Sequence, residues 1–369
     1  MIFRINDYFF DTSCCILYPS DIEKNKILEF IEDFEKNFDK TRKILFSKDA
    51  SNNINTRIAF DSCGVMPTYN CNLHCKYCAY SSGENKYNID VNLNAAKIFL
   101  EDMIKRKAYE SFATQDAKPL HIDFTGGGEP TYNWNLFCNI VFFAKYTCAK
   151  YDVAYTIGMT TNGVLSDEQL DFIINNFNKV MISYDGLPSI QEQNRNQQEK
   201  ITKVIENSIS KLASSEVELM IRTSIWYKDI HLLTDMFNYI NGLLGRDGNA
   251  VWSIYPIENE GRALKSDFDF RISSLKDLLE FYLDTQNRLS RETMKIGITK
   301  IELPIFIKNI CNIFCGAIDV VAPWLLPNGE IVTCVASPMG KVVIGKIEEN
   351  KITNYEKYYD KLLEVTKKI

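Results

Sequence analysis

Three cysteines lie within eight residues at Cys71, Cys75 and Cys78, in the run CNLHCKYC. Thiolates are soft ligands that suit iron–sulfur clusters and zinc. Three thiolates on a four-iron cluster leave one iron without a protein ligand, whereas a structural zinc site closes with a fourth ligand. His74 lies inside the run as a possible fourth ligand, but the second cysteine pair typical of structural zinc is absent nearby. The run therefore favours an iron–sulfur cluster with one open iron.

Three further motifs follow in chain order, each directly after a predicted strand. Gly126–Pro130 reads GGGEP, and glycines allow a backbone to approach a ligand closely. Thr161–Gly163 reads TNG, and Ser183–Gly186 reads SYDG, with Arg195 twelve residues after Ser183. The alternatives are an ordinary glycine turn at the first motif and a solvated charge at Arg195.

Together these motifs resemble those of the radical S-adenosylmethionine (SAM) superfamily. The spacing C-x₃-C-x₂-C, with the aromatic Tyr77 before the last cysteine, is similar to the superfamily's cluster-binding loop. In that superfamily the open iron binds the amino and carboxylate groups of SAM. One electron then cleaves the sulfonium, and the resulting 5′-deoxyadenosyl radical abstracts a hydrogen atom. The resemblance covers about residues 61 to 262 and extends weakly to about residue 363.

The resemblance also implies which residues contact SAM. Gly127, Gly128 and Glu129 would bind the methionine amino group. Arg195 would pair with the carboxylate, because a planar guanidinium suits that group, and Ser183 would lie near the cofactor. The full implied set is Tyr77, Gly127, Gly128, Glu129, Asn162, Ser183 and Arg195. No catalytic acid or base is assigned, although His121 and Glu258 are weighed as bases against structural and solvated roles.

A second group of cysteines lies near the C-terminus at Cys311, Cys315 and Cys334. Asn328-Gly329 between two apolar runs predicts a hairpin that brings Cys315 and Cys334 together. This stretch resembles the start of the SPASM or twitch auxiliary-cluster domain, but no cysteine follows Cys334. The alternatives are an auxiliary [4Fe–4S] cluster with an open iron, an added oxygen ligand such as Asp319, and a scaffold without a cluster.

The elements that must position the first four motifs alternate between strands and helices. This alternation predicts a parallel α/β sheet with right-handed crossovers, and six units are too few for an eight-stranded barrel. We therefore expect a partial (β/α)6 barrel with functional residues at the carboxyl ends of its strands. The predicted strands are Ser62–Met66, Leu120–Phe124, Ala154–Thr160, Lys179–Tyr184, Glu218–Ser224 and Val251–Tyr255. The predicted helices are Asn92–Lys107, Trp134–Lys150, Ser166–Asn176, Glu199–Ser214 and Ile230–Leu244.

Three regions follow from this pattern. Residues 1–56 form an N-terminal appendage with short β-leaning runs and an amphipathic stretch at Ile22–Phe46, a possible peptide-recognition element. Residues 57–270 form the radical SAM core. Residues 271–369 comprise a linker helix at Ser273–Arg291 and a small SPASM/twitch-like module of a β-hairpin and a helix.

Composition limits the classes of function. Among 369 residues, 42 basic and 48 acidic side chains give a net charge of −6, which argues against general nucleic-acid binding. No apolar run reaches the roughly 18 residues that span a bilayer, and no secretory signal is apparent, so a cytoplasmic protein without a membrane partner is expected. In that compartment eleven cysteines indicate metal binding more than disulfides.

The sequence thus predicts a radical SAM maturase of a ribosomally made peptide. Hydrogen abstraction would drive a crosslink, an epimerisation or an oxidation, and an external flavodoxin- or ferredoxin-like protein would supply the electron. The alternatives are a radical SAM enzyme acting on a small molecule, by alcohol dehydrogenation or in cofactor biosynthesis, and a non-catalytic iron–sulfur protein.

Overall fold

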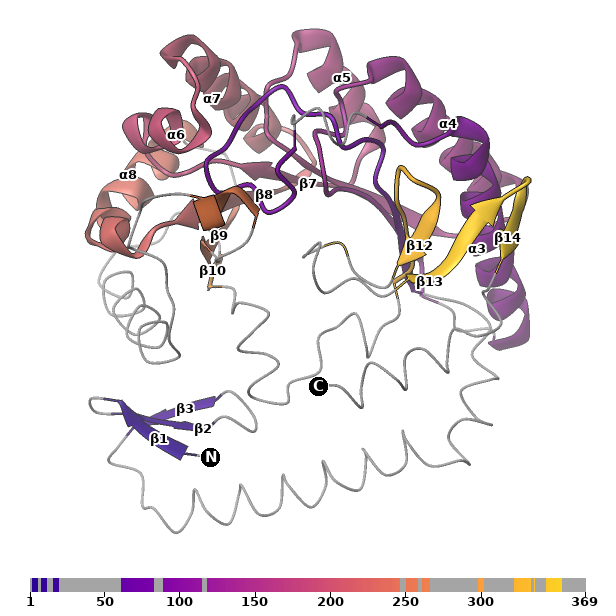
Figure 1. Cartoon of the computed structure of the whole chain (residues 1–369), viewed down its shortest axis with the longest axis horizontal. Helices are drawn as coiled ribbons and strands as arrows, with labels where there is room; N and C mark the ends of the chain where they lie inside the picture. Colours follow the sequence, from indigo (N-terminus) through magenta and orange to yellow (C-terminus); the bar gives the residue numbers. More distant parts are fainter. Residues whose placement is uncertain are drawn as a thin grey trace.

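A computed structural model provides the structure of the chain (Figure 1). It describes residues 2–5, 8–11, 16–19, 61–82, 89–114, 118–245, 250–257, 261–265, 298–301, 322–332, 335 and 343–353. Two sheets are present in these ranges, one of three strands and one of eleven.

The large sheet contains the predicted barrel strands. Its order is β10-β9-β8-β7-β6-β5-β4-β11-β12-β13-β14, and every neighbouring pair from β10 to β11 is parallel. The barrel strands are β4 (Ser62–Val65), β5 (Leu120–Phe124), β6 (Tyr155–Thr161), β7 (Lys179–Ser183), β8 (Glu218–Ile225) and β9 (Val251–Pro256). The expected partial α/β barrel is confirmed. It is extended at its two sides by β10 (Ile298–Ile301) and β11 (Trp324–Leu325).

Helices follow the outer side of the curved sheet (Figure 1). They are α3 (Leu93–Thr114), α4 (Trp134–Lys150), α5 (Asp167–Asn176), α6 (Pro188–Arg195), α7 (Glu199–Ala213) and α8 (Leu233–Leu243). In α4, Phe137, Ile140, Val141 and Ala144 are buried, which is the spacing of one helical face. Phe124 of β5 packs edge-on against Phe137, with ring centroids 5.6 Å apart. The core therefore lies between the sheet and the helices.

Alternation along β5 separates the two faces of the sheet. Leu120, Ile122 and Phe124 are fully buried beneath the helices, whereas His121 and Asp123 are only partly covered. Successive side chains of a strand point to opposite faces, so His121 and Asp123 lie on the inner, concave face. The same alternation in β7 and β8 places Ser183 and Arg222 on this inner face, together with Met181 and Met220.

The predicted C-terminal hairpin is confirmed and joins the barrel directly. β11 pairs antiparallel with β12 (Glu330–Val332), which pairs with β13 (Val343–Glu348), and β14 (Lys351–Thr353) ends the sheet. Gly64 makes the junction with β4 possible, because a Cβ there would lie 2.2 Å from the ring of Trp324. The hairpin is therefore continuous with the first barrel strand.

The second sheet is formed by the N-terminal β-leaning runs. β1 (Ile2–Ile5), β2 (Tyr8–Asp11) and β3 (Ile16–Pro19) pair antiparallel in chain order. The predicted helical stretches at Ile22–Phe46 and Ser273–Arg291 lie outside the described residues. Across the described ranges, no helix is both long enough and apolar enough to cross a bilayer.

Candidate active site

The three-cysteine loop follows β4 directly. Cys71, Cys75 and Cys78 are partly exposed, and their thiols lie close enough to influence one another's charge. Burial raises the pKa of Cys71 to about 11 and that of Cys75 to about 12, and the neighbouring thiols add to both shifts. Iron must therefore displace protons from these thiols when it binds.

The donor set of this loop fits a cluster rather than a single ion. In the part of the chain that the structure describes, no group of three or more His, Cys, Asp or Glu side chains is arranged to hold one metal ion. A four-iron cluster makes a different demand, because each thiolate binds a separate iron. Three neighbouring thiols on one loop meet that demand, and His74 is engaged elsewhere, 3.3 Å from Arg262 Nη1.

The glycine turn after β5 packs directly against the chain that leads into Cys71. Gly126 and Gly127 have φ angles of 95° and 32°, which favour glycine. The N–H of Gly128 donates to Thr68 O at 3.0 Å, and the N–H of Glu129 donates to Asn70 O at 2.8 Å. A Cβ on Gly128 would lie 2.1 Å from Asn70 O, so only glycine permits this approach.

This close approach gives a first prediction. A Gly128→Ala variant must separate the turn from the cysteine loop by about an ångström, and displacements of that size lower rates on the order of 10²-fold. The measurement is 5′-deoxyadenosine released from SAM by the anaerobically reconstituted, dithionite-reduced protein. Gly242→Ala is the matched control, because nothing lies within 4 Å of a Cβ there and the rate should be unchanged. Equal rates of 5′-deoxyadenosine release by Gly128→Ala and Gly242→Ala would contradict the predicted importance of this close packing.

Glu129 connects the glycine turn to the TNG motif. Its buried carboxylate accepts bonds at Oε1 from the hydroxyls of Thr131 and Thr161, at 2.9 and 2.8 Å, and from Thr131 N–H at 3.3 Å. Oε2 accepts from Asn162 N–H at 2.7 Å. Burial nevertheless raises the pKa of Glu129 above its usual value. Oε1 is saturated by three donors, whereas Oε2 has a lone pair left for a further donor such as an amino group.

Asn162 in turn reaches the cysteine loop. Its side-chain Nδ2 donates to Asn72 Oδ1 at 2.7 Å and lies 3.8 Å from Cys71 Sγ. The GGGEP turn, the TNG motif and the first cysteine are thus joined by hydrogen bonds, as their order at the carboxyl ends of successive strands predicts.

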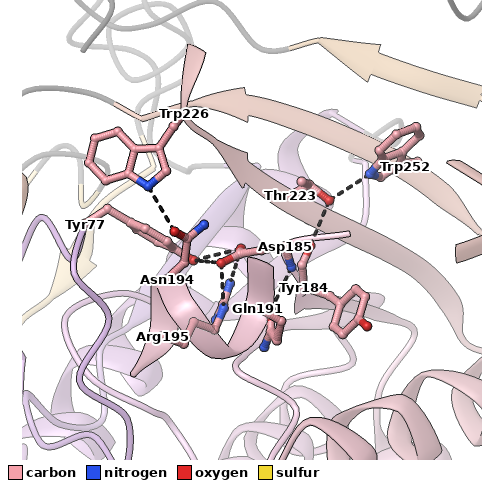
Figure 2. A network of polar contacts seen from close by, with 9 residues as sticks. All are labelled: Tyr77, Tyr184, Asp185, Gln191, Asn194, Arg195, Thr223, Trp226 and Trp252. Carbon is pink, nitrogen blue, oxygen red and sulfur yellow. Dashed lines mark hydrogen bonds and ion pairs between the residues drawn. The ribbon is translucent and has the colours of Figure 1, made fainter. Parts of the chain in front are cut away.

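Asp185 of the SYDG motif and Arg195 form a buried ion pair (Figure 2). Both charges lie close enough to Cys75 to act on its thiol. Arg195 Nη2 and Nε lie 2.9 and 3.3 Å from the carboxylate oxygens of Asp185. The Tyr77 hydroxyl donates to the same carboxylate at 2.8 Å, and its ring centroid lies 5.7 Å from the guanidinium. Asp185 is 0% and Arg195 3% exposed, so this pair is removed from water. Burial opposes the charge of Arg195, yet Asp185 holds its pKa well above the usual value.

Helix α6, which the sequence did not predict, holds this ion pair against the cysteine loop. Gln191 Oε1 accepts from Asp185 N–H at 2.7 Å, and Asn194 O accepts from Lys76 N–H at 2.8 Å. Asn194 Oδ1 also accepts from Trp226 Nε1 at 3.0 Å (Figure 2). The available signals were Pro188 at the first turn and Asn196, whose φ of 50° ends the helix. Arg195 is therefore buried, not solvated.

The inner face of the barrel carries further polar side chains. Ser183 ends β7 in register with Arg222 of β8, and Arg222 lies 4.5 Å from the ring centroid of Tyr255. Burial raises the pKa of Asp123 to about 6. His121 Nδ1 lies 2.8 Å from the Thr156 hydroxyl. Sequence reasoning missed Asp123, although it alternates with buried apolar residues on the strand that leads into GGGEP.

The second cysteine group cannot be placed in the same way. Cys311, Cys315, Cys334, Asp319 and Glu258 lie outside the described residues, so their roles stay predictions. The described C-terminal hairpin strands do approach the cysteine loop. The Tyr80 hydroxyl donates to Val335 O at 2.8 Å, and four buried residues form an apolar cluster there. They are Met66, Tyr69, Leu326 and Val332.

Comparisons with known proteins give one family match and several similar folds. Residues 65–219 match the family model of the Radical SAM superfamily. The solved structure of anSMEcpe with bound AdoMet has a TM-score of 0.60 at 16% identity, covering 82% of each chain. The same protein with AdoMet and the Cp18Cys peptide has a TM-score of 0.59 at 16% identity, covering 82% of this chain and 81% of that chain. Streptococcus suis SuiB bound to precursor peptide SuiA has a TM-score of 0.54 at 12% identity, covering 98% of this chain and 89% of that chain. At such identities the likeness concerns the fold, and no curated protein matches the chain.

Proposed function

Because the chain belongs to the radical SAM superfamily through residues 65–219, we propose that it is a maturase of ribosomally made peptides. Superfamily membership makes it a SAM-cleaving enzyme and implies a [4Fe–4S] cluster and SAM. When bound and reduced, that cluster supplies the electron that splits SAM into methionine and a 5′-deoxyadenosyl radical. The observation that carries the SAM-cleaving part of the proposal is that the three-thiol loop is joined to Glu129 through Asn162 and to the buried Asp185–Arg195 pair through Tyr77.

The described side chains have separate tasks in binding SAM. Cys71, Cys75 and Cys78 would hold the cluster. Glu129 would accept a hydrogen bond from the methionine amino group through Oε2, where only one donor is present. Arg195 would attract the methionine carboxylate with a charge that Asp185 keeps in place. Tyr77, Gly127, Gly128, Asn162 and Ser183 would line the site as the superfamily resemblance implies.

Asp123 is our candidate for a proton acceptor in the barrel. Its carboxylate lies on the inner face, three residues before the glycine turn, and its pKa of about 6 leaves it mostly ionised at neutral pH. A general base acts best when its pKa lies near the working pH. Asp123 would accept the proton that a substrate radical inside the barrel must lose.

A peptide substrate is favoured by the N-terminal sheet and by the similar structures. β1 and β3 are the outer strands of the three-stranded sheet, and an outer strand offers backbone groups to which an extended peptide adds. Two of the similar folds were solved with peptides bound. We propose that residues 1–19 dock the peptide, that an auxiliary cluster sits at Cys311, Cys315 and Cys334, and that a flavodoxin- or ferredoxin-like protein supplies the electron.

Coexpression with short peptides encoded beside the gene tests this function. We expect one peptide to lose two hydrogen atoms in a crosslink or an oxidation, or to gain deuterium from heavy water in an epimerisation, as measured by mass spectrometry. The variant with Cys71, Cys75 and Cys78 changed to alanine should leave that peptide unmodified. A chain lacking residues 1–19 should still cleave SAM but modify the peptide poorly. If no peptide changes while a polyol is oxidised, the small-molecule alternative replaces this proposal.

A further inference from the structure

One arginine from the far side of the barrel contacts the cysteine loop at several points. Arg262 lies in the short 3₁₀ helix η3 (Gly261–Lys265), which follows β9. Its Nε donates to Cys75 O at 2.8 Å, and its Nη1 donates to Ser82 O at 2.9 Å. Its backbone N–H donates to Cys78 O at 3.0 Å. The residue is 8% exposed, so these bonds are formed largely out of water.

We propose that Arg262 is a positioning residue for the iron–sulfur cluster, holding Cys75 and Cys78 where their thiolates meet it. The inference rests on the proposed function only in requiring a cluster on this loop, and it does not depend on a peptide substrate. Arg262 bonds the carbonyl oxygens of Cys75, Cys78 and Ser82, so it acts on the loop through its backbone.

The need for such a residue follows from the local chain. Residues 71–82 contain no helix or strand, so their carbonyl groups lack the partners that regular structure supplies. A guanidinium carries several donors in a rigid plane and can bind two carbonyls at once. Arg262 does so on both sides of Cys78, at Cys75 O and at Ser82 O. A lysine, with one compact ammonium, would reproduce only part of this arrangement.

Gly261, the residue before Arg262, is independent evidence that η3 packs closely against the cysteine loop. Gly261 has a φ of 54°, and a Cβ there would lie 2.3 Å from both Cys78 O and Ala79 O. The backbone before Arg262 therefore rests directly on the cysteine loop. No larger residue fits without separating the two segments.

The order of strands in the sheet explains why the cysteine loop needs the contact with Arg262. The loop leaves β4, whereas Arg262 follows β9, which lies five strands away in the sheet order. The loop must therefore extend across the carboxyl end of the barrel, and its far side is fixed by η3. Apolar contacts support the junction, since Tyr77 packs against a small buried cluster of Trp226, Ile257 and Ala263. Without Arg262 the far side of the loop would keep these apolar contacts but lose its ionic hydrogen-bond donor.

The charge of Arg262 has a second consequence. A four-iron cluster with three thiolates is anionic and becomes more negative when it is reduced. A buried cation at the Cys75 carbonyl favours the reduced form, because nearby charge and hydrogen bonds set cluster potentials. Removal of the charge should therefore lower the reduction potential, whereas an arginine-to-lysine change should lower it less.

The test compares Arg262→Gln, Arg262→Lys and Gly261→Ala after anaerobic reconstitution. We expect Arg262→Gln to bind iron and sulfide about ten-fold more weakly, the typical effect of removing a group that orients metal ligands. Its cluster should have a more negative potential and a smaller change in its electron paramagnetic resonance spectrum on SAM addition. Arg262→Lys should recover part of the potential. Gly261→Ala should lose iron although Arg262 is intact. The double variant with Arg262→Gln should bind iron little more weakly than either single variant, since both changes act at one contact.

Two control variants separate loop positioning from general destabilisation. Arg106→Gln removes an arginine that bonds Asp102 on the outer helix α3. Lys107→Met breaks the two ion pairs that the buried Lys107 makes with Asp61 and Glu110, and it should lower stability without changing the cluster spectrum. An Arg262→Gln protein with the iron content, potential and SAM response of the unaltered protein would overturn the inference alone. Unaltered protein that forms no cluster on the cysteine loop would instead refute the proposed function.

Discussion

Replacement of Cys71, Cys75 and Cys78 together by alanine is expected to abolish reductive SAM cleavage. The three thiols are the groups of this loop that would bind the cluster's irons, and alanine has no side-chain atom that binds iron. The effect should exceed that of any single change at a SAM contact, because SAM then loses the iron to which it binds as well as its source of electrons. Release of 5′-deoxyadenosine under dithionite, together with iron and sulfide content, measures the result.

The same variant tests the second cysteine group. Iron equivalent to one remaining four-iron cluster would support the auxiliary site predicted at Cys311, Cys315 and Cys334, whereas no remaining iron would make the hairpin module a scaffold. Cys138→Ala is a suitable control, because this free cysteine is also partly exposed but lies on α4. SAM cleavage by the triple variant at the rate of that control would contradict the assignment of the cluster to this loop.

The barrel could be predicted from sequence because its periodic patterns are strong. β5 and α4 have the bounds that were predicted, Leu120–Phe124 and Trp134–Lys150. The predicted helix at Ile230–Leu244 is confirmed as α8 from Leu233 to Leu243, whereas its first residues belong to a 3₁₀ helix, η2 (Tyr227–Leu232), since 3₁₀ turns are frequent at the ends of α-helices. Strand β10 was missed because its four residues carry too short a pattern to recognise.

The candidate site was predictable only in part. Motif order along the chain brought the GGGEP turn, Asn162 and the cysteines to one edge, as parallel strands require. The roles of Asn194 and Arg262 were not predictable, because Asn194 accepts from the Lys76 N–H and Arg262 donates to Cys75 O. Backbone groups such as these leave no signature in the sequence. Arg262 and Cys75 are also 187 positions apart, so no local spacing relates them. Likewise, the superfamily resemblance assigned Arg195 to SAM binding but did not predict that Arg195 contacts Asp185 and Tyr77 within the protein.

An Asp185→Asn variant should lose about 3–5 kcal/mol of unfolding free energy, as happens when one partner of a buried ion pair is removed. Asparagine retains an oxygen that accepts from the Tyr77 hydroxyl, so the loss isolates the charge of Asp185. Arg195 would then be a buried cation without its carboxylate, beside Cys75. Urea unfolding of the protein without its cluster measures this loss directly.

Matched variants separate that charge effect from other changes. Asp102→Asn removes an ion pair with Arg106 in which both side chains are about one-third exposed, and it should cost no more than about 1 kcal/mol. Adding Arg195→Gln to Asp185→Asn should restore stability, because the two sites couple through one contact and neutral amides replace both charges. That double variant should still bind SAM poorly if Arg195 also attracts the methionine carboxylate. Recovery of stability together with full SAM affinity would limit Arg195 to a structural role, and an unchanged stability in Asp185→Asn would contradict the buried pair itself.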